Sequence, residues 1–193
     1  VSAPGLEALI EASANAYLFS FLVDGSELLC LRLDSGTWVF NRRSGTFSTF
    51  ETWGNDTWTP SCFDGGVFGS SVDGTTFAFS GHVDEGGVLE RRFRAGFPLN
   101  GGGVPINSIS LRCNVGQTGY LTGTYTDPIV EMRLSRDGGK TWGEWRPKTL
   151  GTQANYRKLV RWNNCGQASH PGLLAEFRVT APVDWRVSDV LLN

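Results

Sequence analysis

The chain has 193 residues, with 17 basic and 19 acidic side chains and a formal net charge of −2. This balance disfavours proteins that bind nucleic acid or membranes through a large positive field. A hydrophobic content of 40% excludes intrinsic disorder, and no stretch approaches the roughly 18 apolar residues of a membrane-spanning helix. Because the chain begins at Val1 and holds one methionine, Met132, we expect it to be part of a longer product.

Apolar spacing predicts one short N-terminal helix followed by strands. Leu6, Leu9, Ile10 and Ala14 have helical spacing after Gly5, whereas the residues that follow alternate with a period of two. The Asp24-Gly25 pair between two alternating runs indicates a hairpin. The 25 glycines of the chain fit many tight turns of this kind. The predicted apolar strand positions are Tyr17, Phe19, Phe21 and Val23; Leu29, Leu31 and Leu33; Phe77 and Phe79; Ile109, Leu111 and Cys113; Val130, Met132 and Leu134; Val160 and Trp162; Ala175, Phe177 and Val179.

The fold class predicted from this pattern is all-β, with antiparallel, propeller-like blades. The run from Tyr17 to Trp53 contains four consecutive strands, which is the content of one blade of about 40–45 residues. Residues 54–98 are long enough for a second blade. A chain of 193 residues holds about four blades at most, so we expect an incomplete propeller that further chain would complete.

A glycine-rich segment, 99–104, divides the predicted propeller-like residues 1–98 from a C-terminal β subregion, 105–193. The net charge changes sign close to this segment. Residues 1–100 hold 6 basic and 12 acidic side chains, and residues 101–193 hold 11 and 7, which gives −6 and +4.

The segment from Ser135 to Trp142 matches the Asp-box pattern S-x-D-x-G-x-T-W at Ser135, Asp137, Gly139, Thr141 and Trp142. Its chemistry is local: we expect Asp137 to accept hydrogen bonds from turn amides, the glycines to adopt positive φ, and Trp142 to pack back on the sheet. The box resembles those of sialidases, where it lies in hairpins away from the catalytic centre. It therefore predicts a structural hairpin in the C-terminal subregion.

Arg91, Arg92 and Arg94 form the one dense basic run. They are candidates for contact with phosphate or with an acidic surface of a neighbouring copy, and a solvated strand face explains them equally well.

The sequence gives weak evidence for a catalytic or a metal-binding group of residues. Tyr120 and Tyr125 are available for a sialidase-like nucleophile, yet one Asp-box and half the usual blades argue against that enzyme. His82 and His170 lack a serine elbow, and no zinc spacing is present. For Asp64, Asp73 and Asp84 we favour turn chemistry over calcium binding. The four cysteines are read as buried free thiols: Cys30, Cys62, Cys113 and Cys165. We therefore expect no enzyme activity, no cofactor and no metal.

Two stretches resemble the packaged-DNA stabilisation (tail hub) proteins of short-tailed bacteriophages. The first runs from Leu6 through the Asp24-Gly25 hairpin to Thr37-Trp38-Val39-Phe40-Asn41 and Ser44-Gly45-Thr46-Phe47. The second begins at Val130, passes through the Asp-box and includes, in order, Trp145-Arg146, Leu150-Gly151, Asn155-Tyr156-Arg157, Arg161-Trp162, Gly166 and Phe177-Arg178-Val179.

This resemblance implies a structural protein of the virion tail, assembled in the bacterial cytoplasm. Such proteins form a ring of six copies below the portal and its adaptor ring, extend the DNA channel, retain the packaged DNA and carry the tail needle or fibres. The partners implied are therefore further copies of this chain, the portal adaptor, needle or fibre proteins, and DNA that passes without being read. No membrane is implied.

A second hypothesis is a carbohydrate-binding propeller or sandwich module of a phage fibre or secreted protein. In that case Trp53, Trp58 and Trp185 would be exposed and would stack on sugar rings. A degenerate sialidase-like hydrolase is the third hypothesis.

Overall fold

A computed structural model describes residues 5–23, 25–79, 83–84 and 87–193. The chain forms two compact units, unit 1 (Val1–Gly87) and unit 2 (Val88–Asn193). Apart from helix α1 (Leu6–Ala12) and the 3-10 turn η1 (Gly123–Thr126), their regular structure is antiparallel β-sheet. The predicted all-β class and the short N-terminal helix are confirmed. No helix in the described ranges is long and apolar enough to cross a membrane.

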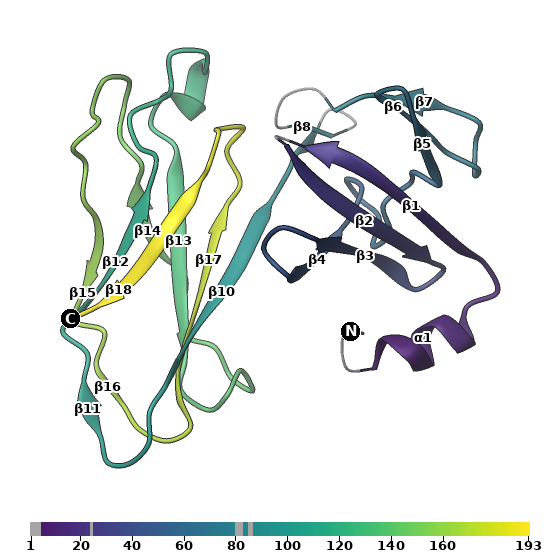
Figure 1. Cartoon of the computed structure of the whole chain (residues 1–193). Helices are drawn as coiled ribbons and strands as arrows, with labels where there is room; N and C mark the ends of the chain where they lie inside the picture. Colours follow the sequence, from purple (N-terminus) through teal and green to yellow (C-terminus); the bar gives the residue numbers. More distant parts are fainter. Residues whose placement is uncertain (1–4, 24, 80–82, 85–86) are drawn as a thin grey trace. The chain divides into compact units, whose positions relative to one another are not determined.

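The largest sheet of unit 1 is a four-stranded meander in the order β1-β2-β3-β4 (Figure 1). Four consecutive strands were predicted between Tyr17 and Trp53, and they are present; Asp24 of the first hairpin lies outside the described residues, while Gly25 has φ 74°. Two small sheets follow. The strands of unit 1 are β1 (Ala16–Val23), β2 (Ser26–Leu33), β3 (Gly36–Asn41), β4 (Thr46–Phe50), β5 (Cys62–Asp64), β6 (Val67–Gly69), β7 (Thr76–Phe77), β8 (Val83–Asp84) and β9 (Gly87–Val88), the last of which reaches the boundary with unit 2.

An aromatic core covers the inner face of this meander. Phe21, Cys30 and Val39 are buried on successive strands and pack with Trp58 and Phe68 from beyond β4. The rings of Phe21 and Trp58 lie 5.6 Å apart, and those of Phe21 and Phe68 lie 5.1 Å apart. The core of unit 1 is therefore one sheet face closed by the β5–β7 segment.

Residues 54–98 do not form a second four-stranded blade in the part of the chain that the structure describes. They contribute a three-stranded sheet, β5-β6-β7, and the two-stranded β8-β9 pair. The last eight of them, Arg91–Pro98, form β10, which belongs to unit 2. Unit 1 thus has one four-stranded meander of the kind expected for a blade in its described residues, and a propeller arrangement of blades stays a prediction.

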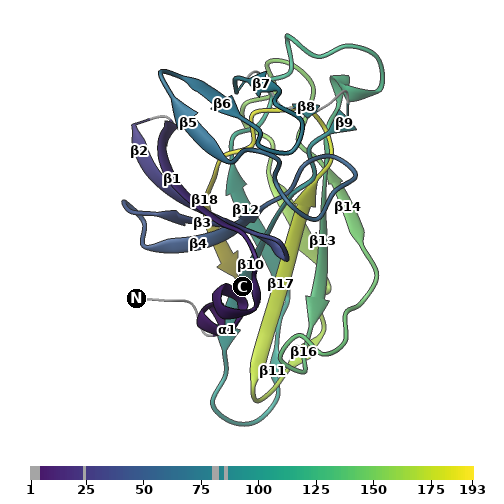
Figure 2. The same ribbon diagram turned by 90° about the vertical axis from the view of Figure 1, so that its right-hand side faces the viewer.

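Unit 2 is built from a four-stranded sheet, β10-β17-β13-β14, and a three-stranded sheet, β15-β12-β18 (Figure 2). Side chains from both sheets share one buried cluster, and the rings of Trp162 and Phe177 meet there with centroids 5.6 Å apart. Predicted apolar positions, including Ile109, Met132 and Val179, are fully buried. The strands of these sheets and the two short strands β11 and β16 have the following bounds: β10 (Arg91–Pro98), β11 (Val104–Pro105), β12 (Ser108–Cys113), β13 (Ile129–Ser135), β14 (Arg146–Thr149), β15 (Val160–Asn163), β16 (Gln167–Ala168), β17 (Gly172–Val179) and β18 (Val187–Leu192).

The boundary predicted at residues 99–104 is placed too late. Strand β10 pairs along its whole length with β17, from Arg91 opposite Val179 to Pro98 opposite Gly172. This eight-residue pairing binds residues 91–98 to unit 2, so the glycine-rich segment is a loop inside that unit. The division falls between Gly87 and Val88 instead.

With this boundary the charge asymmetry is larger than residues 1–100 and 101–193 suggested. Unit 1 holds 3 basic and 11 acidic residues, a net charge of −8, and unit 2 holds 14 and 8, a net charge of +6. Four residues of the 88–100 stretch cause the change: Glu90, Arg91, Arg92 and Arg94.

The cysteines are free thiols, as predicted, but they are not all buried. Cys30 and Cys165 are buried in the cores of unit 1 and unit 2, whereas Cys113 is half-buried and Cys62 is exposed. Cys62 is exposed because it begins the short strand β5, whose burial pattern leaves both end residues on the solvent side.

Candidate functional site

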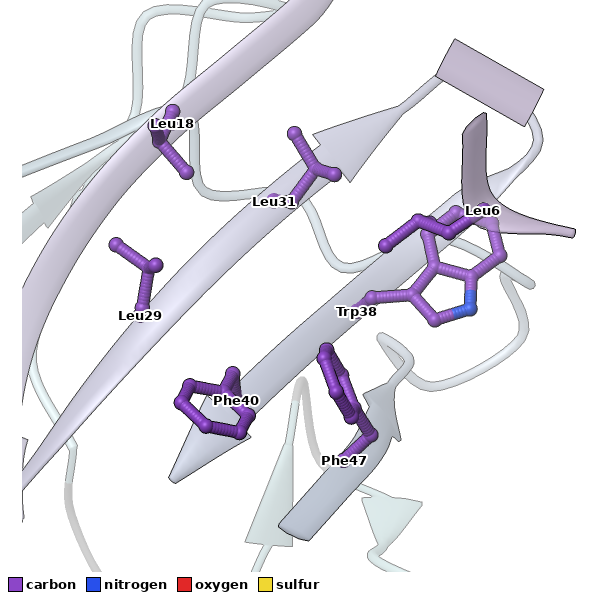
Figure 3. Close-up of a pocket in the computed structure, with 7 residues that line it drawn as sticks. All are labelled: Leu6, Leu18, Leu29, Leu31, Trp38, Phe40 and Phe47. Carbon is purple, nitrogen blue, oxygen red and sulfur yellow. The ribbon is translucent and has the colours of Figure 1, made fainter. Parts of the chain in front are cut away.

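The outer face of the β1–β4 sheet is apolar. Strand register aligns Leu18, Leu31 and Trp38 in one row across three strands. It aligns Leu29, Phe40 and Phe47 in the next row. Figure 3 shows these six side chains on one side of the sheet, together with Leu6 of α1. We call these seven residues the open face.

The open face lines a shallow hollow of about 390 Å³. None of its seven side chains is titratable or carries a hydroxyl. Leu18 is 67% exposed and Phe47 is 39% exposed, and Leu22, beside the hollow on the same face of β1, is 70% exposed. Contiguous exposed apolar surface is typical of protein-binding or ligand-binding surfaces. The hollow has no group that would perform acid–base or nucleophilic chemistry.

The local sequence explains why this face is apolar. Antiparallel sheets with one solvated face alternate apolar and polar residues, whereas strands buried on both faces are apolar throughout. In β1 seven of the eight residues from Ala16 to Val23 are apolar, with Ser20 as the exception. Phe19 and Phe21 face the core, so Leu18 and Leu22 necessarily face outward. The sheet therefore has the composition of one covered on both faces.

In unit 2, the Ser135–Trp142 segment forms a turn held by its own polar side chains. The Asp137 carboxylate accepts the Thr141 amide at 2.9 Å, the Thr141 hydroxyl at 2.6 Å and the Ser135 hydroxyl at 2.7 Å. The Ser135 oxygen in turn accepts the Gly139 amide at 2.9 Å. Gly138 and Gly139 have φ of 74° and 92°. The sequence analysis expected the amide donor to Asp137 and the positive φ of the glycines, but not the hydroxyl contacts of Ser135 and Thr141.

Those hydrogen bonds set the acidity of Asp137. The side-chain and backbone donors of Thr141, followed by the Ser135 hydroxyl, hold the pKa of the Asp137 carboxyl well below its usual range. The carboxylate is therefore ionised at neutral pH and is fully used as an acceptor within the turn. It has the chemistry of a turn anchor.

Trp142 belongs to a stack of arginine and tryptophan side chains on the outer face of the β10-β17-β13 sheet, with Arg133 at its centre. The Arg94 and Arg133 guanidinium carbons lie 5.2 and 4.9 Å from the Trp142 ring centroid. Arg133 and Arg178 lie 4.5 and 4.1 Å from the Trp145 ring centroid. We call these five residues the arginine–tryptophan stack; their order is Arg94, Trp142, Arg133, Trp145 and Arg178.

Carboxylates pair the cations of the stack. Glu176, with no exposed surface, pairs with Arg94 at 2.8 Å and with Arg133 on the opposite strand. Glu131 pairs with Arg178 at 2.7 Å. Burial raises the pKa of Glu176, but the hydrogen bonds and charges of the two arginines outweigh it, so the pKa lies below its ordinary value. The outer face of this sheet is thus internally satisfied.

The basic run of Arg91, Arg92 and Arg94 does not form a single site. Strand alternation places Arg91 on the core side, where it donates to the Ala181 carbonyl at 2.8 Å. Burial lowers the pKa of Arg91. Arg92 and Arg94 point the other way, and each pairs with a glutamate, Glu90 and Glu176. Arg94 instead meets Trp142, which joins two features that the sequence analysis treated separately.

The tryptophans proposed as sugar platforms differ in exposure. Trp53 is 57% exposed, but Trp58 is buried at 7%, because it closes the unit 1 core. Trp185 is half-buried and packs on Phe93 with ring centroids 5.5 Å apart. The three indoles therefore do not form an exposed set.

Two of the residues weighed for catalysis or metal binding, Tyr120 and Asp73, make structural hydrogen bonds. The Tyr120 hydroxyl accepts the Asp184 amide at 2.7 Å, and Tyr125 lies in η1. Asp73 accepts the Thr75 amide at 3.1 Å, which is turn chemistry. Across the described ranges, no group of three His, Cys, Asp or Glu side chains is placed to hold a metal ion. His82 lies outside the described residues, as does the side chain of Asp84.

Sequence reasoning missed the open face and the partners of the stack. The signal for the open face was present in the almost uninterrupted apolar run of β1. Glu176, Arg133 and Arg178 gave no local signal, because each meets its partners across strands far apart in the sequence.

No protein-family model matches the chain, and no curated protein has a significant sequence match to it.

Proposed function

We propose that the chain is a non-catalytic structural subunit that assembles with further copies of itself. The observation that carries this proposal is the open face, an apolar and uncharged surface on a sheet whose other face is already packed. Burying one such leucine or phenylalanine side chain is worth about 1.5–3 kcal/mol, which favours association over solvent exposure.

The resemblance narrows the kind of assembly. A tail hub of a short-tailed bacteriophage is a ring that surrounds the DNA channel, holds packaged DNA and connects portal adaptor to needle or fibres. Rigid β units and opposite net charges on unit 1 and unit 2 fit contacts between unlike surfaces of neighbouring copies, which close into rings. On this proposal the protein resides in the virion tail, and DNA passes it without sequence reading.

Three measurements test the proposal. Sedimentation velocity of the full chain over a hundredfold concentration range should give association, and negative-stain electron microscopy should give cyclic particles. Antibodies against the chain should label the tail end of particles of the phage that encodes it. A chain that stays monomeric at every concentration would contradict the proposed function.

The carbohydrate-binding and hydrolase hypotheses have less support. Trp58 is buried and Trp185 is half-buried, so a sugar platform would consist of Trp53 alone. Tyr120 already accepts a backbone hydrogen bond from Asp184. A glycan array and a fluorogenic sialoside assay would each be expected to give no signal above background.

A further inference from the structure

We infer that the open face of one copy receives the tip of unit 2 from the next copy. The tip consists of two neighbouring loops, 114–127 and 151–159, which expose Tyr120, Tyr125, Tyr156 and Leu159. This inference rests on the proposed function, because it names the two surfaces through which the copies assemble. Its test separates a failure of the pairing from a failure of the assembly.

Hydrogen bonds hold the two loops of the tip in one arrangement. Gly116 donates its amide to the Leu150 carbonyl at 3.2 Å and accepts the Ala154 amide at 2.9 Å. The Thr118 amide donates to the Gln153 side chain at 2.8 Å. A Cβ placed on Gly116 would lie 2.6 Å from the backbone of Asn155, so the loops are in close contact. A surface that is already ordered loses little conformational entropy on binding.

The tip exposes the residue types that anchor protein interfaces. Tyr120, Tyr156 and Leu159 are 57%, 60% and 63% exposed. Between the last two lie Arg157 and Lys158, both exposed. Tyrosine and arginine are enriched at interfaces, and an aromatic anchor binds best in an apolar hollow. The open face provides such a hollow.

Net charge selects the pairing of unlike units. Unit 1 has a net charge of −8 and unit 2 of +6, so two copies of unit 1 repel each other, whereas unit 1 and unit 2 attract. Beside the open face, helix α1 carries exposed Glu7 and Glu11, both opposite in sign to Arg157 and Lys158. Complementary charge steers association and disfavours the like-unit contact.

Since the two surfaces are different, the contact is heterologous. A pair of copies then still has one free open face and one free tip, so further copies add head to tail and form a ring or a filament. A contact between two open faces would instead stop at a dimer.

The test uses two full-chain double variants that each remove one surface. Leu18→Lys with Leu29→Lys makes the open face cationic, and Tyr156→Glu with Leu159→Glu makes the tip anionic. Val72→Lys and Val104→Glu are the matched controls, because Val72 and Val104 are exposed at 70% and 43% and belong to neither surface. Circular dichroism and thermal unfolding establish that each variant is folded.

We expect each double variant alone to associate at least tenfold more weakly than the unaltered chain in sedimentation velocity. An equimolar mixture should form a one-to-one pair, because the tip of the first variant and the open face of the second are intact. The controls should associate like the unaltered chain.

Three results overturn the inference. If the tip variant associates normally on its own, the tip is not the partner of the open face, and the proposed assembly survives without this contact. If the mixture gives no pair, the two surfaces are not partners. If the unaltered chain is monomeric at every concentration, both the inference and the proposed function fail. Should a charged variant not fold, Leu18→Gln with Leu29→Gln and Tyr156→Ser with Leu159→Ser replace it.

Discussion

The outer faces of the two four-stranded sheets differ in chemistry: one carries paired charges and the other carries exposed apolar side chains. On the β10-β17-β13-β14 sheet of unit 2, Glu176 pairs with arginines from both neighbouring strands, and Trp142 and Trp145 fold back from the hairpin to stack on them. On the β1–β4 sheet of unit 1, the outer face is apolar, and Leu6 of α1 lies beside it. The first face has its partners within unit 2, whereas the second still has exposed apolar surface.

The contrast shows that an apolar strand pattern alone does not identify the core face. In β13, period-two alternation separates buried Met132 from Arg133 of the stack. In β2, Leu29 and Leu31 alternate just as regularly, yet they lie on the open face, while Cys30 between them is in the core. The residues of both faces must therefore be compared. A sheet with one polar face can be exposed to solvent on that face, whereas a sheet that is apolar on both faces requires a partner.

The largest expected effect compares the two faces of the β1–β4 sheet with one substitution each. Trp58→Ala removes the ring that Phe19, Phe21, Phe50 and Phe68 pack around, so we expect unit 1 to lose about 3–5 kcal/mol of unfolding free energy. Trp38→Ala on the open face should cost about 1–2 kcal/mol, because that ring is only half-buried. Urea unfolding measures both. Equal losses would mean that the open face is as well packed as the core.

The next prediction concerns the outer face of unit 2. Glu176→Ala leaves Arg94 and Arg133 without their shared carboxylate, and we expect a loss of about 3 kcal/mol, near the low end for a broken buried ion pair, because the Arg94 side chain is 58% exposed. Glu144→Ala, an exposed acid in the adjacent loop, is the control and should change stability by less than about 0.5 kcal/mol. Similar effects of the two substitutions would contradict a structural role for the stack.

Much of the fold was predictable from the sequence because strand alternation and turn residues are local signals. The helix after Gly5, the four strands between Tyr17 and Trp53, and the buried positions of β12, β13 and β17 follow from spacing alone. The Ser135–Trp142 turn was predictable for the same reason, since all its bonds join residues at most four positions apart.

The remaining features depend on pairing between distant segments. Strand β10 joins unit 2 because it pairs with β17, some eighty residues later, and no local residue signals this. The burial of Trp58 likewise follows from tertiary contact with β1 and β6. Charge composition suggested two halves, but only the pairing of β10 places their boundary.

Lowering the pH is expected to have a smaller effect on the stability of the fold. The pKa of Asp137 is lowered by the donors of Thr141 and Ser135, and that of Asp34 by donors of Asn15, Ser13 and Ala14. A carboxyl whose pKa is lower in the folded state stabilises the fold fully above its unfolded pKa of about 3.9, and the contribution is lost as the pH falls through the folded value.

In Asp137→Asn, the unfolding free energy of unit 2 should therefore change less between pH 6 and pH 3 than it does in the unaltered chain. Urea midpoints of unit 2 at the two pH values measure this, and Asp64→Asn, an exposed acid of unit 1, is the control. An unchanged pH dependence in Asp137→Asn would show that the turn carboxylate does not couple to folding.

The smallest perturbation uses the thiols to compare the two units without a destabilising substitution. Cys62 is exposed and should react with a disulfide reagent such as Ellman's reagent first. Burial raises the pKa of Cys30 to about 12, and that of Cys113 to about 11, so both should react far more slowly than Cys62.

The buried thiols can then report the opening of each unit, because Cys30 lies in the unit 1 core and Cys165 in the unit 2 core. Their labelling is measured by peptide mass spectrometry in a Cys62→Ser background. If assembly covers the open face, raising the protein concentration should slow the labelling of Cys30 more than that of Cys165, because docking on the outer side of the β1–β4 sheet stabilises unit 1 against opening. Equal slowing of both thiols would place the stabilising contact elsewhere.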